Sequence, residues 1–261
     1  ITLSESTAGT DDAQRQLNVM SKQMQTLLEQ QNNICGLLER GIYTEEIFLK
    51  RNRALCDEIE ELLSYGFTSF FFSDDTFAFS DERLDEFYKE VKKRNLKFKW
   101  TSNIRIADIN DFKISRMKEI GAYRVFIGVE TVSAQTQQVI NKNLNIDLIK
   151  EKIEILKKYD MEFHASFILG NPGDTEADIE ETIKFVKQVK PTLVTFNLIK
   201  VYPGLDLYAN PEKYGIVMPD KYWYEKDDWS KQVVTWTKDL PRETLERLSK
   251  KCLFEFISGA K

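Results

Sequence analysis

Cysteine and histidine are scarce in this chain, and their scarcity excludes several kinds of site. The chain of 261 residues has three cysteines (Cys35, Cys56 and Cys252) and one histidine, His164. The cysteines are far apart, so they form neither a disulfide framework nor a CxxC or CxxxCxxC metal motif. Widely spaced thiols are typical of proteins from a reducing compartment, and we therefore expect a cytoplasmic protein.

Long apolar runs and a strong excess of one charge are also absent. No segment has the length of a membrane-spanning helix, and we find no signal peptide. The net charge of −5 and a pI near 5.3 argue against nucleic-acid binding by the whole chain. The first residue is Ile1 rather than Met, so we expect a processed or incomplete product. The 42% of hydrophobic residues are enough for one sizeable core.

The N-terminal part has the seven-residue period of a coiled coil. Its seam is apolar except for one glutamine, and consists of Leu17, Met20, Met24, Leu27, Gln31, Ile34 and Leu38. A break at 41–44 precedes a second helical pattern over about 45–65. We predict an N-terminal helical (coiled-coil) hairpin as a first domain, residues 1–56. Two roles remain open for residues 11–65: docking on the same chain, or forming a homo-oligomer.

From residue 67 on, short apolar segments alternate with amphipathic helical patterns. The predicted strands are 67–73, 97–102, 123–129, 162–169 and 193–199, and the predicted helices are 81–94, 108–120, 134–141, 147–159, 175–189 and one from about 241. Ser80 and Ser133 are the predicted N-caps of the helices that follow them. Repeated strand–helix units without hairpin signals predict parallel strands. Five strands are too few for a closed eight-stranded barrel. The predicted fold class is therefore α/β, with residues 57–261 forming a partial TIM-type barrel of parallel strands.

Polar residues and glycines follow the predicted strands at their ends. The candidate binding residues are Asp74, Asp75, Arg105, Glu130, Gly170, Gly173 and Tyr202. Parallel strands end at one edge of a sheet, so we expect these residues to surround one polar ligand. Carboxylates suit an ammonium group or a pair of hydroxyls, and glycine turns let a flat ring lie against the backbone.

Structural alternatives stay open for several of these residues. Asp74 and Asp75 also fit the start of a loop, and Glu130 also fits a cap of the following helix. His164 lies within an apolar strand, where a core or rim position is commoner than a ligand role. The run Phe70–Phe72 is apolar enough that we expect this strand to be covered on both faces.

Five segments in order resemble one enzyme family. FFSDDTF, WTSNIRI, FIGVETVS, FILGNPGDT and VYPG are similar to segments of the radical S-adenosylmethionine (SAM) enzymes, especially the class found behind a cobalamin-binding domain. The resemblance covers about residues 57–210. It implies a SAM-binding partial barrel with a [4Fe–4S] cluster that cleaves SAM to a radical. It also implies that Asp74 and Asp75 receive the amino group of SAM, Arg105 its carboxylate and Glu130 its ribose or carboxylate region. The turns with Gly170, Gly173 and Tyr202 would border adenine.

The chain departs from this family at the cluster ligands. The family carries CxxxCxxC after its first strand, whereas Cys35 and Cys56 are too far apart to replace that motif. We therefore expect no metal ligands and no catalytic residues in this chain, and impaired or absent radical catalysis, with SAM-like ligand binding retained. Two alternatives remain: a non-enzymatic protein that interacts through its coiled coil, and a fused or fragmentary gene product.

Residues 11–56 resemble a second family. The segment LLERGIYTEEIFLKR is similar to the coiled-coil hairpin of large serine recombinases, which mediates contacts between recombinase subunits. This similarity implies a protein–protein contact rather than recombination. It also predicts a gene fusion, with its junction near residues 52–57.

Overall fold

The computed structural model describes residues 45–259 except 79, 141, 143 and 226–234. Its order is α2 (Glu45–Ser64), β1 (Ser69–Phe72), α3 (Asp81–Lys93), β2 (Lys99–Asn103), η1 (Ile106–Asp108), α4 (Asp111–Glu119), β3 (Ala122–Glu130), α5 (Ala134–Val139), α6 (Ile146–Lys158), β4 (Glu162–Leu169), α7 (Glu176–Val189), β5 (Leu193–Leu198), α8 (Asp206–Ala209), η2 (Pro211–Tyr214), β6 (Ile216–Val217), η3 (Trp223–Glu225), β7 (Trp236–Thr237) and α9 (Arg242–Gly259).

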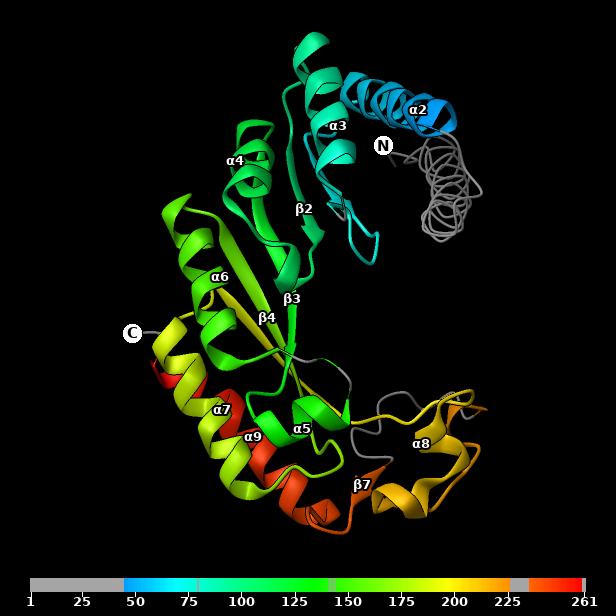
Figure 1. Cartoon of the computed structure of the whole chain (residues 1–261), viewed down its shortest axis with the longest axis vertical. Helices are drawn as coiled ribbons and strands as arrows, with labels where there is room; N and C mark the ends of the chain where they lie inside the picture. The colour runs from blue at the N-terminus through cyan, green and yellow to red at the C-terminus, as the bar shows by residue number, and fades with distance from the viewer. Residues whose placement is uncertain (1–44, 79, 141, 143, 226–234, 260–261) are drawn as a thin grey trace, which may run out of the picture.

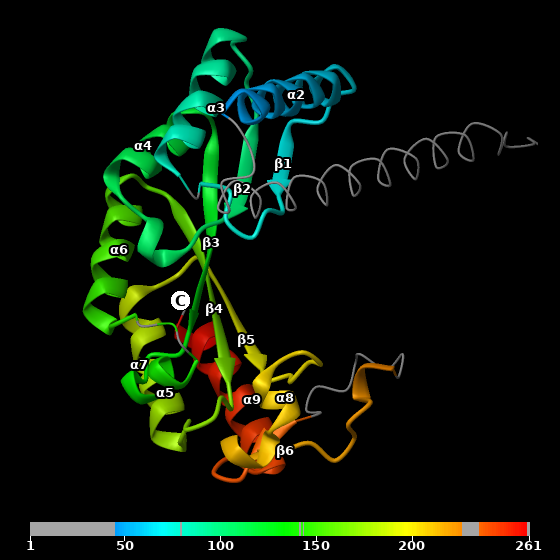
Figure 2. The same ribbon diagram turned by 45° about the vertical axis from the view of Figure 1, so that its right-hand side comes forward.

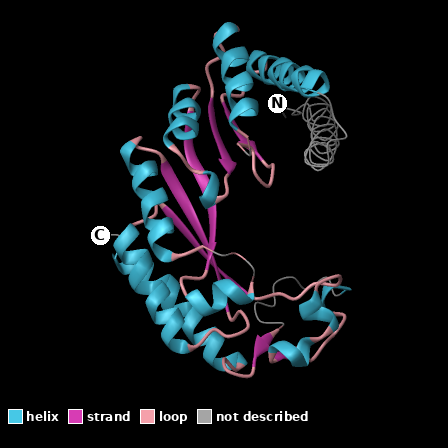
Figure 3. Ribbon diagram, in the orientation of Figure 1, coloured by secondary structure: helices cyan, strands magenta, loops and turns pink. Residues whose placement is uncertain are grey.

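Five of the strands form one parallel sheet in the order β1-β2-β3-β4-β5. The sheet is curved, and helices α3, α4, α6 and α7 lie along its convex side (Figures 1 and 2). Helix α9 packs beside α7 and β5 at one end of the sheet, and α2 packs on α3 at the other. The predicted α/β partial barrel of parallel strands is therefore confirmed, as the strands and helices of Figure 3 make plain.

Alternation along the strands places the core on the convex side of the sheet. On β4, Phe163, Ala165 and Phe167 are buried, whereas the intervening His164 and Ser166 are only partly buried. Successive side chains of a strand point to opposite faces, so the helices cover one set and the concave face displays the other. The concave face is therefore where a ligand can reach the sheet.

Local capping fixes where the helices that cover the sheet begin. Ser80 accepts a hydrogen bond from the backbone N–H of Arg83 at 3.1 Å, and Ser133 accepts one from Thr136 at 3.5 Å. Both N-caps were predicted from the sequence and are confirmed. Each hydroxyl satisfies one of the N–H groups that a helix leaves unpaired at its start.

One expectation about the fold is wrong, and one pair of strands was not predicted. The strand with Phe70–Phe72 is not covered on both faces, because Phe71 points to the concave side and is 53% exposed. The sequence also gave no sign of β6 and β7, which form a small antiparallel pair. Strands of two residues are too short to produce a periodic pattern.

The predicted N-terminal hairpin lies mostly outside the described residues, which begin within its second helix. That helix, α2, runs without interruption through residues 56 and 57, where the sequence placed a domain boundary. Helix α2 packs against α3, one of the helices on the convex side of the sheet (Figure 1). Among the residues that the structure describes, no helix combines the length and apolar character needed to cross a membrane.

Candidate functional site

A cavity of about 540 Å³ opens on the concave face of the sheet. Its walls come from the strands β2 to β5 and from the segments that follow β1, β2 and β3. The predicted site residues Asp75, Arg105 and Glu130 all line it. Three strand ends therefore bring their polar residues to one place, as expected for a parallel sheet.

Glu130 and Lys142 form the charged pair of this cavity. Lys142 Nζ donates to Glu130 Oε1 at 2.8 Å and to the carbonyl oxygen of Gly128 at 2.7 Å. The pairing of β3 with β4 shifts between Gly128 and Glu130, and Glu130 has φ 67, which is uncommon for a residue other than glycine. Such an irregularity changes the direction of the side chain at that position. It places the carboxylate beside Lys142, and none of the hydrogen bonds found for Glu130 caps α5.

The ion pair of Glu130 and Lys142 requires a glycine at position 128, because the Glu130 carboxylate lies directly over it. A Cβ atom at Gly128 would lie 2.3 Å from Glu130 Oε1 and 3.1 Å from Lys142 Nζ. Even an alanine would displace the ion pair. The close approach therefore depends on the absence of a side chain at this position.

Arg105 and Asp75 lie on the rim of the cavity. Arg105 Nε donates to Asp108 Oδ2 at 2.8 Å, and its side chain is 63% exposed. Asp75 is exposed next to the end of β1. The rim thus offers carboxylates and a guanidinium to a ligand that carries both an ammonium and a carboxylate group.

Asp74 does not line the cavity, although it is adjacent to Asp75. Its side chain is buried, and Arg83 Nη2 donates to Asp74 Oδ2 at 3.1 Å. Arg83 also lies over the ring of Phe77. Burial raises the pKa of the Asp74 carboxyl, and the guanidinium opposes that rise. Asp74 therefore anchors the segment after β1 to helix α3. In addition, Asn103 Nδ2 donates a hydrogen bond to the backbone carbonyl oxygen of Asp74 at 2.9 Å.

The predicted glycine turn after β4 also lies away from the cavity lining. Gly170 has φ 85, and a Cβ there would come within 2.9 Å of Leu245 on α9. The backbone N–H groups of Gly170 and Asn171 donate to Asp174 Oδ2 at 3.1 and 2.9 Å. Gly173 has φ 88 and completes this turn. The glycines thus allow a tight turn that packs on α9.

Tyr202 is the remaining predicted residue that does not line the cavity. Its ring is 42% exposed and meets Trp223 edge-on at 5.0 Å between ring centroids. Trp223 is buried and donates its Nε1–H to the carbonyl oxygen of Val201 at 3.1 Å. This aromatic contact packs the segment after β5 against η3.

Four cavity residues have side chains whose role the sequence did not predict. His164 and Ser166 come from β4, and Thr195 and Asn197 from β5. His164 and Ser166 share the concave face because they alternate with the buried residues of β4. Thr195 and Asn197 alternate with Val194 and Phe196, which are partly buried and pack against the core. Lys142 was also missed, since it follows α5 and only the folded chain brings it to Glu130. The alternation of β4 was the signal that could have placed His164 on the cavity.

The described cysteines do not fit a three-thiolate iron–sulfur site. Cys56 lies on α2 and Cys252 on α9, at opposite ends of the sheet (Figure 1). Burial raises the pKa of both thiols to about 12, whereas cluster ligation requires thiolates. Within the described ranges no three His, Cys, Asp or Glu side chains are grouped so as to hold a metal ion.

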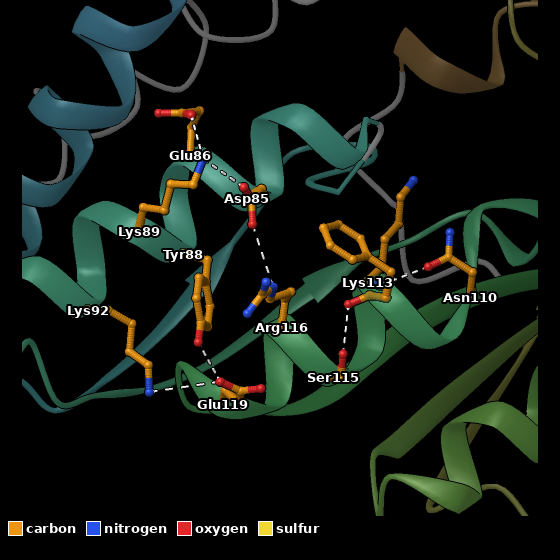
Figure 4. Close-up of polar contacts among 11 residues, drawn as sticks. Asp85, Glu86, Tyr88, Lys89, Lys92, Asn110, Lys113, Ser115, Arg116 and Glu119 are labelled. Atoms are coloured by element: carbon orange, nitrogen blue, oxygen red, sulfur yellow. Dashed lines mark hydrogen bonds and ion pairs between the residues drawn. The ribbon is translucent and has the colours of Figure 1, made fainter.

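A second polar cluster lies on the convex side, between α3 and α4 (Figure 4). The Arg116 guanidinium stacks on Tyr88 at 4.2 Å, and Tyr88 donates its hydroxyl to Glu119 at 2.5 Å. Asp85 Oδ1 is 3.5 Å from Arg116 Nε. These groups satisfy one another across two helices, so this cluster joins the helices rather than forming a site.

Comparisons with known proteins agree with this geometry. Residues 45–186 match the profile of the radical SAM superfamily. An uncharacterized methyltransferase of Pyrococcus horikoshii is 30% identical over 154 residues, which cover 58% of this chain and 34% of that protein. The anaerobic magnesium-protoporphyrin IX monomethyl ester cyclase of Rubrivivax gelatinosus is 26% identical over 197 residues, 71% of this chain and 36% of that protein. The chain spans about a third of the length of these curated relatives.

Solved structures share the fold at low identity. The radical SAM methyltransferase TsrM from Kitasatospora setae superposes with a TM-score of 0.61 at 11% identity, covering 80% of this chain and 45% of that one. Coproporphyrinogen III oxidase from Escherichia coli gives 0.54 at 15% identity, covering 73% and 40%. Because the superfamily profile covers more than half of the chain and the parallel sheet matches these folds, the chain belongs to the radical SAM superfamily.

Proposed function

We propose that this chain binds SAM, or a similar adenosyl amino acid, in the concave cavity, and that it does not assemble a [4Fe–4S] cluster from its own cysteines. The observation that carries the proposal is the convergence of Asp75, Arg105 and Glu130 on one cavity from three strand ends. These groups match the charges of the amino-acid part of SAM. Radical catalysis by this chain alone would then be impaired or absent.

Each rim residue has a distinct role in this proposal. The Asp75 carboxylate receives the ammonium group, and the exposed Arg105 guanidinium receives the carboxylate. Glu130, held by Lys142, accepts hydrogen bonds from the ribose hydroxyls. SAM supplies a sulfonium group whose carbon–sulfur bond can be broken. Asp74, Gly170, Gly173 and Tyr202 remain ligands by sequence resemblance only, since their side chains or turns lie outside the cavity lining.

The cysteine positions support the second half of the proposal. Both described thiols are buried, and neither lines the cavity. The third, Cys35, is 21 residues before Cys56 in the sequence, a spacing unlike CxxxCxxC. A cluster at this cavity would therefore need thiolates from another polypeptide segment.

Titration calorimetry with SAM tests the binding site. The Asp75→Asn variant should lose about tenfold to one hundredfold in affinity, because a charge-assisted hydrogen bond contributes roughly 1.5–3 kcal/mol. Asp147→Asn is the matched control, since Asp147 is an exposed carboxylate at the start of α6. Absence of SAM binding by the unmodified chain at millimolar concentration would rule out the site, and equal losses in both variants would rule out the role of Asp75.

Anaerobic reconstitution with iron and sulfide tests the cluster half of the proposal. We expect far less than one cluster per chain, measured as bound iron and visible absorption. A stoichiometric cluster that responds to SAM would contradict this. The predicted homo-oligomer through residues 11–65 is a separate proposal, and light scattering tests it, with a monomeric chain as the contradicting result.

A further inference from the structure

One part of the concave cavity carries no charged side chain and is not used by the proposed SAM contacts. It is formed by Phe126 of β3, His164 and Ser166 of β4, and Thr195 and Asn197 of β5. These residues come from three neighbouring strands and lie on the same face of the sheet. We refer to these five residues as the cavity floor.

Aromatic rings continue from the floor across the concave face. The rings of Phe126 and His164 lie 4.9 Å apart at an interplanar angle of 45°. Phe71 of β1 meets Phe126 edge-on at 5.4 Å and is 53% exposed. Three rings thus form a row from β1 to β4. A large apolar ring left exposed beside a cavity is a surface that a ligand can cover.

The polar groups of the floor are neutral. His164 Nε2 is paired with Thr195 Oγ1, and Asn197 Nδ2 donates to Ser166 Oγ at 3.1 Å. Burial lowers the pKa of His164, and the Arg124 guanidinium adds to this effect, so the imidazole is uncharged near neutral pH. His164 Nδ1 is buried without a hydrogen-bond partner among the described residues. The floor can therefore exchange hydrogen bonds but cannot balance a ligand charge.

The physical consequence is a preference for flat, uncharged ligands. Aromatic rings pack on other rings face-on with an offset or edge-on, and these contacts add to the effect of area burial. A charged group placed on the floor would lose its hydration and gain no opposite charge. The cavity volume of about 540 Å³ lies in the range of small-molecule sites.

We propose that the cavity floor binds a neutral, planar aromatic ring of the substrate, next to the charged rim. The proposal deepens the function given above, since it assigns a substrate class to the same cavity. It rests on the ring row of Phe71, Phe126 and His164 and on the uncharged hydrogen-bonding pairs beside it. In this arrangement the rim binds SAM, and the floor binds the aromatic ring of the substrate.

Ligand-observed NMR titration with 2-naphthol tests this proposal on the full chain. We expect 2-naphthol to bind, and its saturated analogue decahydro-2-naphthol to bind at least about threefold more weakly, because only the aromatic compound gains the ring contacts. The anion 2-naphthoate should also bind more weakly. Equal binding of the saturated analogue would overturn the aromatic preference, and equal binding of the anion would overturn the neutral character.

Two variants locate the binding. Phe126→Leu should weaken 2-naphthol binding about threefold to tenfold, and Phe71→Leu should act in the same direction. Phe112→Leu is the matched control, because Phe112 is 38% exposed on α4 and does not line the cavity. Loss of binding in the control alone, or unchanged binding in both Phe126→Leu and Phe71→Leu, would overturn the proposal.

The same NMR samples separate this inference from the SAM proposal. Saturating SAM should leave 2-naphthol bound, whereas displacement of 2-naphthol by SAM would mean that the floor takes the adenine ring of SAM and would overturn the substrate assignment. If SAM binds and 2-naphthol does not, the floor assignment is wrong and the rim assignment stands. If 2-naphthol binds with the expected variant pattern and SAM does not, the floor assignment stands and the rim assignment is wrong. Circular dichroism of each variant verifies that the sheet is folded before either result is used.

Discussion

Phe167 and Ser166 are neighbours on β4 but lie on opposite faces of the sheet. Phe167 is fully buried on the convex side, where its ring lies 5.7 Å from Phe196 and 6.4 Å from Phe185. Ser166 lines the cavity on the concave side, where its hydroxyl accepts a hydrogen bond from Asn197. On this strand, every second side chain packs in the core, and the side chains between them face the cavity.

Substitutions at these two positions test the comparison most strongly. Phe167→Ala should lower the free energy of unfolding by about 3–5 kcal/mol, because it removes a buried ring and leaves a cavity. Ser166→Ala should lower it by no more than about 1 kcal/mol, the net value of one hydrogen bond. Urea unfolding followed by circular dichroism measures both. Comparable losses would show that the two faces contribute equally to stability.

The buried ion pair of Asp74 and Arg83 tests the contribution of the convex side to stability near β1. Arg83→Met should cost about 3 kcal/mol, because it leaves a buried carboxylate unpaired. Lys89→Met, on the same helix, is the control. Its side chain is 62% exposed and its ion pairs are screened by solvent, so this change should have little effect on the unfolding free energy. Adding Asp74→Asn to Arg83→Met should recover part of the loss. A loss in Arg83→Met no larger than that of the control would mean that Asp74 does not depend on Arg83.

Asp174 gives the smallest expected effect, and it depends on pH. Burial raises the pKa of its carboxyl to about 6 from an ordinary value of 3.8, although hydrogen bonds from Thr136 and Asn171 oppose the rise. A raised pKa means that the folded chain binds the proton more tightly than the unfolded chain. The contribution of Asp174 to stability is therefore complete below about pH 4 and is lost as the pH rises through 6.

Comparison with Asp174→Asn isolates this contribution. Between pH 4 and pH 7, the unfolding free energy of the unmodified chain should fall by about 2 kcal/mol relative to the variant. The exposed Asp147→Asn should show no such change relative to the unmodified chain. Parallel pH profiles for the unmodified chain and Asp174→Asn would contradict the assignment.

Much of the fold followed from local patterns. The strand 162–169 was predicted with the bounds that β4 has, because the segment is a short apolar run and Gly170 ends it. The N-caps Ser80 and Ser133 were also predicted, since capping depends on residues only three positions apart. The strand with Phe71 was misread because an apolar side chain looks the same in a sequence whether a helix or a cavity faces it.

The site could be predicted only in part. Asp75, Arg105 and Glu130 were recognised as strand-end residues and do meet at the cavity. Asp74 could not be separated from Asp75, because Asp74 is buried through its ion pair with Arg83, which belongs to the next helix. Lys142 was missed because its contact with Glu130 requires the loop after α5 to fold back over Gly128.

The sequence by itself determined the order of strands and helices, the parallel sheet and the absence of a three-cysteine motif. These depend on residue type and on spacing along the chain. Only the tertiary structure decided which face of each strand is open, which of two adjacent carboxylates is free, and which rings meet at the floor. These depend on contacts between residues far apart in the chain, such as Phe71 with Phe126 and His164 with Thr195, which become neighbours only when the sheet forms.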